Sequence, residues 1–182
     1  EEVKRLWDAM LKNDTEAEQY LEKRGLGEAV ALGLVRFAFA GHPNKDVATP
    51  ARRGYRIAML VIDTVGNPVG IQLRLVCEPK KKGLEKEIKQ WTVKGSSPSR
   101  GFFAQPHFVE GEPIICVTEG MADTLAVAAW SKLPTVGAAG AGNLPKLALQ
   151  LEATGVSVEN RLFFLFTQND GPPKHESRKT WR

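Results

Sequence analysis

The first part of the chain carries apolar side chains at helical spacing. In the opening segment, apolar residues fall at i, i+3, i+4, i+7 and i+8, which forms one stripe along a helix. These residues are Val3, Leu6, Trp7, Met10 and Leu11. A second helix is predicted to begin with a capping box between Thr15 and Glu18 and to end at Gly25. The two segments together predict a short helical hairpin.

A β-rich region follows, in which apolar and polar residues alternate with a period of two. Residues 55–63 and 69–77 predict two strands joined by a turn at residues 66–68. The second strand alternates two sets of side chains: Ile71, Leu73 and Leu75 on one face, and Gln72, Arg74 and Val76 on the other. This pattern buries one face and places Arg74 on the opposite one. Residues 89–94 predict a further short strand that displays its lysines.

From Pro113 onward the pattern changes to short apolar strands separated by helices. The predicted elements, in chain order, are strand 114–118, helix 122–131, strand 134–136, helix 143–153 capped by Asn143, and strand 161–167. A βαβαβ series predicts a parallel sheet with right-handed crossovers. The predicted fold class is therefore α/β, a parallel sheet with flanking helices preceded by a mixed α+β subdomain.

Two subdomains are expected, at residues 1–112 and 113–182. The first combines the helical hairpin with the β-rich region, and the second holds the βαβαβ unit. Because that unit stops after its third strand, we expect the chain to be a fragment of a longer protein, truncated at its C-terminus.

The composition is that of a folded globular protein. The chain has 182 residues, of which 42% are hydrophobic and 25% charged, and this argues against disorder and low-complexity structure. Apolar runs such as residues 126–130 are far too short to cross a membrane, and no secretory signal opens the sequence. Cys77 and Cys116 lack CxxC or Cys/His spacing, which excludes a structural zinc site and disfavours a disulfide framework. A reduced cytoplasmic protein without a membrane partner is expected.

Positive charge is concentrated in one segment of the chain. The net charge is +4 overall, yet residues 74–100 hold eight basic and three acidic residues, a local charge of +5. Such a segment is typical of a surface that binds phosphate, most often in nucleic acid. A solvated loop that keeps the protein soluble explains the same charge equally well.

Acidic residues follow the ends of two predicted parallel strands. Glu119 follows the first, Asp170 follows the third, and Asp123 lies one helical turn beyond Glu119. Ligands bind beyond the carboxyl ends of parallel strands, and oxygen-only donors suit Mg²⁺ with phosphate. The pattern therefore raises the hypothesis of metal-assisted chemistry on a phosphate group. The alternative is that Glu119 and Asp123 simply flank a helix start, where acids favour the helix dipole.

Other chemistries find less support. The glycine-rich turn at residues 137–142 lacks the GxGxxG register and a following ribose-binding acid, so a tight strand-to-helix turn is the preferred interpretation. No P-loop motif and no GxSxG motif occurs. The histidines (His42, His107 and His175) lie in loop-like sequence, so a Ser or Cys hydrolase would lack a convincing base.

Several segments together resemble one family. Residues 114–123 (IICVTEGMAD) resemble the first Toprim motif, an apolar strand that ends in Glu-Gly with an Asp four residues after the Glu, and residues 162–170 (LFFLFTQND) resemble the second, which ends in Asp-x-Asp. Residues 20–25 are similar to the YLxxRG element ahead of the catalytic core of bacterial and phage primases. Residues 70–74 resemble its G-x-x-x-R strand, and residues 89–91 its basic-aromatic pair. The chain thus resembles Toprim-domain DNA primases of phage or plasmid type over nearly its whole length.

The resemblance implies a role for each matched acid. Glu119 would be the catalytic carboxylate, acting as a metal ligand or general acid/base, and Asp123 the acid that supports it. Asp170 would be a ligand of Mg²⁺ or Mn²⁺. Gln168 stands where the motif has its first Asp, so it would ligate through a neutral carbonyl, and the affinity for metal should fall.

The resemblance also implies a binding surface and partners. Arg74, Lys89, Lys94 and Gly120 are expected to contact the nucleotide or DNA. The implied activity is template-directed synthesis of a short RNA primer from nucleoside triphosphates on single-stranded DNA, with a replicative helicase in the same or another chain as a further partner.

Departures from the motifs keep alternatives open. Besides Gln168, residues 171–173 (Gly-Pro-Pro) replace the usual small-residue start of the next helix. One alternative is a degenerate Toprim domain that binds single-stranded nucleic acid without catalysis. Others are a different Toprim phosphotransferase, such as a nuclease or topoisomerase-like protein, and a nucleotide-binding regulatory module.

Overall fold

The structure is a computed structural model that describes residues 1–76, 90–104, 113–154 and 161–167. The helices are α1 (Glu2–Asp8), α2 (Thr15–Lys23), α3 (Glu28–Ala31), α4 (Lys45–Arg52), α5 (Met121–Ser131) and α6 (Leu144–Ala153), with 3₁₀ turns η1 (Pro98–Arg100) and η2 (Ala141–Asn143). The strands are β1 (Arg36–Phe37), β2 (Tyr55–Ile62), β3 (Pro68–Leu75), β4 (Gln90–Thr92), β5 (Phe102–Ala104), β6 (Ile114–Thr118), β7 (Thr135–Ala138) and β8 (Leu162–Phe166). Within this described part, none of the helices is long and apolar enough to span a membrane.

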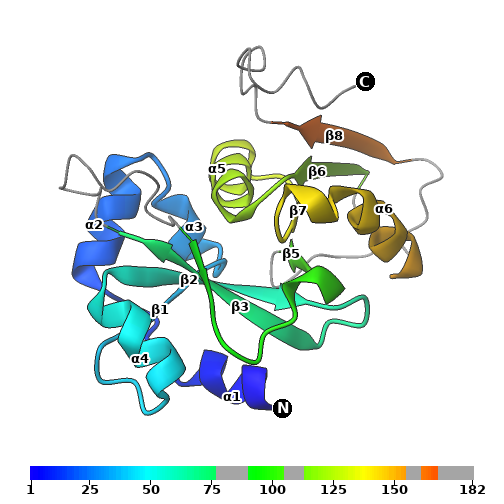
Figure 1. Cartoon of the computed structure of the whole chain (residues 1–182). Coiled ribbons are helices and arrows are strands. Elements are labelled where there is room, and N and C mark those ends of the chain that lie inside the picture. The colour runs from blue at the N-terminus through cyan, green and yellow to red at the C-terminus, as the bar shows by residue number, and fades with distance from the viewer. Residues whose placement is uncertain (77–89, 105–112, 155–160, 168–182) are drawn as a thin grey trace, which may run out of the picture.

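The strands form one mixed sheet (Figure 1). Its order is β4-β3-β2-β5-β7-β6-β8, and β1 pairs with β2 outside this path. β6 pairs in parallel with both β7 and β8, whereas the pairs from β1 to β5, and β5 with β7, are antiparallel. The predicted fold class is confirmed: the parallel strands are the βαβαβ unit, and a mixed α+β region precedes them.

β5 links the antiparallel part to the parallel part. Phe102 pairs with Ile62 of β2 and with Ala138 of β7. The residue before it is a glycine because a Cβ on Gly101 would lie 2.2 Å from the Ile62 carbonyl oxygen. The sheet therefore continues past the subdomain boundary expected near residue 112, and that boundary itself stays a prediction.

β2 buries side chains on both of its faces. On one face, Ile57, Met59 and Val61 pack in a cluster with α2, α3 and α5. On the other, Ala58 packs in a cluster with α1, α4 and the β3 residues Ile71 and Leu73. Helices thus cover both sides of β2, so its sequence reads as a nearly continuous apolar run.

The parallel strands are covered in the same way. Met121 and Leu125 of α5 pack against the face of the sheet that carries α2 and α3. Leu147 and Leu151 of α6 pack on the opposite face, in a cluster with Ile115 and Val136. The α5 and α6 helices were both predicted, and they lie within a residue or two of the expected positions.

The helical hairpin predicted at the N-terminus is wrong in two respects. α1 and α2 belong to different core clusters on opposite faces of β2, so they do not pack as a pair. The N-cap of α2 is Asp14 rather than Thr15: its carboxylate accepts the Ala17 N–H at 3.1 Å, while Glu18 accepts the Asp14 N–H at 2.8 Å. Asp14 is the better cap here because its second oxygen also binds Arg56 across the sheet.

The predicted cap of α6 has the right position but lacks the capping bond. Asn143 is the N-cap residue, yet it has helical backbone angles and its side chain makes no cap hydrogen bond to α6. Its Nδ2 instead donates to the Ala139 carbonyl at 3.0 Å, because the η2 turn already precedes the helix. The sequence patterns also missed β1, β5 and α3, which span four residues or fewer, and the eight-residue α4.

Candidate functional site

The carboxyl ends of the parallel strands meet at one edge of the sheet. Thr118, the last residue of β6, pairs with Gly137 of β7 and with Phe166 of β8. Glu119 and Gly120 follow directly, and α5 begins at the next residue. Glu119 is half-buried, and its carboxylate makes no hydrogen bond or ion pair with any of the described residues. The structure thus places this carboxylate where ligands of parallel sheets bind.

A pair of buried hydroxyls brackets Glu119. Thr118 and Thr124 are fully buried, and their Oγ1 atoms lie 2.8 Å apart. Thr124 Oγ1 donates to the Gly120 carbonyl at 2.7 Å, and Thr118 Oγ1 lies 3.2 Å from the Val136 carbonyl. These three contacts share only two hydroxyl protons. The two shortest form a chain in which Thr118 donates to Thr124 and Thr124 donates to Gly120, so β6 is fixed to the start of α5 on both sides of Glu119.

Gly137 makes this pair of hydroxyls possible. A Cβ on Gly137 would lie 1.8 Å from Thr124 Oγ1 and 2.8 Å from Thr118 Oγ1. Both are overlaps with buried atoms that cannot swing away. Of the glycines in the turn predicted at residues 137–142, this one is required by close packing of β7 against β6 and α5.

Asp123 lies in the first turn of α5, close to the Glu119–Gly120 loop. Gly120 is extended, with φ −168° and ψ 173°, and a Cβ placed on it would be 3.8 Å from Asp123 Oδ2. The structure therefore brings the carboxylate of Asp123 to the loop that carries Glu119. Both side chains offer only oxygen, which is the donor type that Mg²⁺ prefers.

The remaining predicted metal ligands lie outside the described residues. Asp170 and Gln168 follow β8 beyond residue 167, so their place relative to Glu119 is not defined. Within the described ranges, no group of three or more His, Cys, Asp or Glu side chains comes together in a way that could hold a metal ion. The metal site remains a prediction, and it depends on Asp170, the acid that follows β8.

Of the basic residues predicted to contact nucleotide or DNA, the structure describes Arg74 and Lys94. Arg74 is half-buried in β3 opposite Gln90 of β4, and alternation places it on the same face as Gln72, away from Ile71 and Leu73. The two sets of side chains do lie on opposite faces, and Arg74 lies on the side of the sheet that carries α5. The prediction that only one face is buried is wrong, because Gln72 and Val76 on the Arg74 face are only 5% and 4% exposed. Lys94 is exposed in the turn after β4, whereas Lys89 and most of the basic segment lie outside the described residues.

Sequence reasoning missed the residues that hold the Glu119 loop in place. Thr118, Thr124 and Gly137 carry no charge and match no catalytic pattern. The available signal was a glycine inside a short strand, which often marks a close approach of backbone and side chain. It also missed a cavity beside β2, which is described below.

Comparisons with known proteins place the fold. No protein-family model matches the sequence, and no curated protein does so either. Among solved structures, the chain is similar to a DnaG primase catalytic domain bound to single-stranded DNA, with a TM-score of 0.56 and 16% identity over 98% of this chain and 75% of that one. It is also similar to the zinc-binding and RNA polymerase domains of the Aquifex aeolicus primase, with a TM-score of 0.54 and 14% identity over 98% of this chain and 57% of that one. The chain therefore has the fold of a primase catalytic core.

Proposed function

We propose that this chain is a primase-like catalytic core, which joins nucleotides into a short RNA primer on single-stranded DNA. The observation that carries the proposal is the position of Glu119. It follows the central parallel strand of a fold shared with primase catalytic domains over 98% of the chain. The identity of 16% and 14% is too low to carry an activity by itself, so the proposal depends on the site's chemistry.

Glu119 and Asp123 are the described residues that would hold a divalent metal. Their donor set fits, because both are carboxylates at a strand end, and Glu119 has no competing partner among the described residues. A bound Mg²⁺ would neutralise the triphosphate and lower the barrier to attack on the α-phosphate. Asp170 is proposed as a further ligand, with Gln168 beside it as a neutral one.

The protein's own contribution is positioning. The chain of hydroxyls from Thr118 through Thr124 to Gly120 holds the Glu119 backbone in one place before substrate arrives, and catalysis gains most from groups that need no rearrangement. The carboxylate of Glu119 would accept a proton as a general base or bind the metal cation. The guanidinium of Arg74 and the ammonium of Lys94 are proposed to attract the phosphates of nucleotide and template.

Partners follow from the same proposal. Single-stranded DNA is the proposed template, in line with the DNA in the similar DnaG structure, and nucleoside triphosphates are the proposed substrates. A replicative helicase is proposed as the protein partner, because primers are needed where a duplex is being opened.

The test is metal-dependent dinucleotide synthesis. The chain would be incubated with mixed single-stranded templates and the four ribonucleoside triphosphates, with Mg²⁺ or Mn²⁺, and products resolved on a gel. We expect Glu119→Gln to lower product formation about a hundredfold or more, the scale of losing a group active in the transition state. Glu152→Gln is the matched control, because Glu152 is exposed on α6 and should leave the rate unchanged.

The Gln168→Asp variant separates the remaining outcomes. Higher activity in this variant at low Mg²⁺ would show that the neutral ligand weakens metal binding. If no variant yields product while DNA binding is retained, the chain is a nucleic-acid-binding domain without catalysis and the proposal fails.

A further inference from the structure

The sheet has a gap along one edge of β2. β1 pairs with β2 at Ile57 and Ala58, and β5 joins the same edge only at Ile62. Between these two contacts, the chain before β1 turns away into α3, and β5 diverges to pair with β7. No described strand therefore pairs with this edge of β2 from Met59 to Val61.

The main chain of Leu60 points into this gap. Leu60 lies opposite Ile71 of β3, yet the Ile71 carbonyl accepts the Val93 N–H at 3.0 Å, on the far side of β3. The pair is thus of the type that exchanges no hydrogen bonds, and Leu60 must turn its N–H and C=O to the opposite edge. The bond from the Ala38 N–H to the Arg56 carbonyl, at 2.8 Å, confirms that even-numbered residues of β2 face this edge. Leu60 has no partner for these groups among the described residues.

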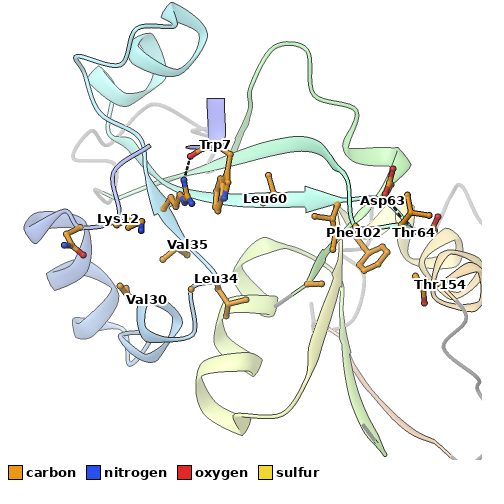
Figure 2. A pocket seen from close by; sticks show the side chains of 17 residues that line it. Trp7, Lys12, Val30, Leu34, Val35, Leu60, Asp63, Thr64, Phe102 and Thr154 are labelled. Atoms are coloured by element: carbon orange, nitrogen blue, oxygen red, sulfur yellow. Dashed lines mark hydrogen bonds between the residues drawn. The ribbon is translucent and has the colours of Figure 1, made fainter. Parts of the chain in front are cut away.

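A cavity of about 840 Å³ occupies the gap. Figure 2 shows Leu60 in its middle, with Lys12 and Asp63 toward opposite ends. The apolar part of the walls comes from Val30, Leu34 and Val35 on one side and Phe102 on the other, and polar residues line much of the rest. Its volume falls within the range of small-molecule sites.

The two ends of the cavity differ in charge. Lys12 is exposed, and it forms no ion pair with any described residue. Arg36, which also lines this cavity, donates to the Trp7 carbonyl at 2.7 Å and lies 3.6 Å from Asp8. At the far end, the Asp63 carboxylate accepts the Val65 and Asn67 N–H groups of the β2–β3 turn. Among the described residues that line the cavity, Lys12 is thus the positive charge that is available to an anion.

These features together favour a compact ligand over an added peptide strand. A strand laid along β2 could form only the pair of hydrogen bonds to Leu60, since its neighbours are either paired or turned away. A planar group with an adjacent donor and acceptor, such as a nucleobase, can satisfy both Leu60 groups at once while its faces contact the apolar residues of the lining. A phosphate attached to it would be attracted by Lys12.

We propose that this cavity is a nucleotide-binding site, with the base against the Leu60 main chain and the phosphate toward Lys12. The site lies apart from Glu119 and needs no metal ion. It is independent of the proposed catalytic function, since it uses none of the same residues.

The test is calorimetric titration with AMP, GMP, CMP and UMP, each in excess EDTA so that metal-dependent binding is removed. At least one monophosphate is expected to bind with a Kd below about 1 mM, and its nucleoside and inorganic phosphate more weakly. Lys12→Glu should weaken binding about tenfold by charge reversal. Lys45→Glu is the control, since Lys45 is also exposed, on α4, and does not line the cavity.

A second measurement addresses Leu60 directly. In ¹⁵N-labelled protein, hydrogen exchange of the Leu60 amide should slow when the nucleotide is bound, and Glu119→Gln should bind it as tightly as the unaltered chain. Unchanged exchange at Leu60, or equal binding by Lys12→Glu, would refute the site even if primer synthesis is found. Loss of oligo-dT binding in Lys12→Glu, with mononucleotide binding absent, would show that the cavity takes a strand instead.

Discussion

The carboxylate of Asp14 joins α2 to β2. It caps α2 through the Ala17 N–H and receives two hydrogen bonds from Arg56 of β2, with its own side chain only 4% exposed. Burial by itself lowers the pKa of Arg56, but the hydrogen bonds and charges of Asp14 and Glu16 together outweigh it and the net shift is upward. The ion pair stabilises the fold only while both partners are present, because removing one leaves the other as an uncompensated, partly buried charge.

Removing the Asp14 carboxylate should destabilise the fold strongly. We expect Asp14→Ala to lower the free energy of unfolding by about 3 kcal/mol, because it removes a cap and leaves Arg56 without its buried partner. Glu16→Gln is the control: Glu16 also binds Arg56, but its side chain is 64% exposed, so the loss should stay below about 1 kcal/mol. Urea unfolding followed by circular dichroism measures both. Equal losses in the two variants would contradict the view that burial decides the effect.

Single residues also show where sequence reasoning stops. Glu119 and Asp123 were identified from sequence because acids after an apolar strand form a visible pattern, and the structure brings them to one loop. The Asp14 cap was assigned one residue late, since Asp14 and Thr15 are both good N-caps and only the position of Arg56, distant in sequence, decides between them. No sequence pattern indicated the Leu60 cavity, because it arises where neither β1 nor β5 pairs with the edge of β2.

At the level of elements, the close contact of β6, β7 and α5 depends on Gly137. The three elements meet where the buried hydroxyls of Thr118 and Thr124 lie against the Gly137 backbone. Short apolar strands and helices of this unit were predictable from periodicity, and their order implied parallel pairing. The sequence did not show which glycine is irreplaceable, because that depends on Thr124 of α5 reaching across to β7.

A methyl group at Gly137 should disrupt this contact. We expect Gly137→Ala to lower the free energy of unfolding by about 2 kcal/mol or more, because its Cβ would overlap Thr124 Oγ1 at 1.8 Å. Gly142→Ala is the matched control, since a Cβ there meets nothing within 4 Å. If the proposed function is right, Gly137→Ala should also raise the Mg²⁺ concentration needed for half-maximal primer synthesis. A Gly137→Ala protein as stable as the control would show that β7 can shift without cost.

Over the whole molecule, the sequence predicted the antiparallel region and the parallel βαβαβ unit, but not the strand that joins them. The antiparallel and parallel parts have different periodicities, so each could be identified. The three-residue β5 that connects them is too short to show a pattern. The position of a strand within the sheet was equally hidden. β8 is an apolar run, yet Leu162 and Leu165 are 54% and 57% exposed, because β8 ends the order of the described strands.

This junction predicts that the chain unfolds as one unit. Phe103 of β5 lies in the same core cluster as Leu21 of α2 and Leu125 of α5, so neither part can lose its structure without exposing apolar surface of the other. We expect one urea transition, in which amide signals from β2 and β7 disappear at the same midpoint in NMR spectra. Phe103→Ala should lower the free energy of unfolding by about 3 kcal/mol, because the side chain is fully buried. Both urea midpoints should therefore fall together. Separate midpoints for β2 and β7 would instead mean that the two parts are independent domains, as a division near residue 112 would allow.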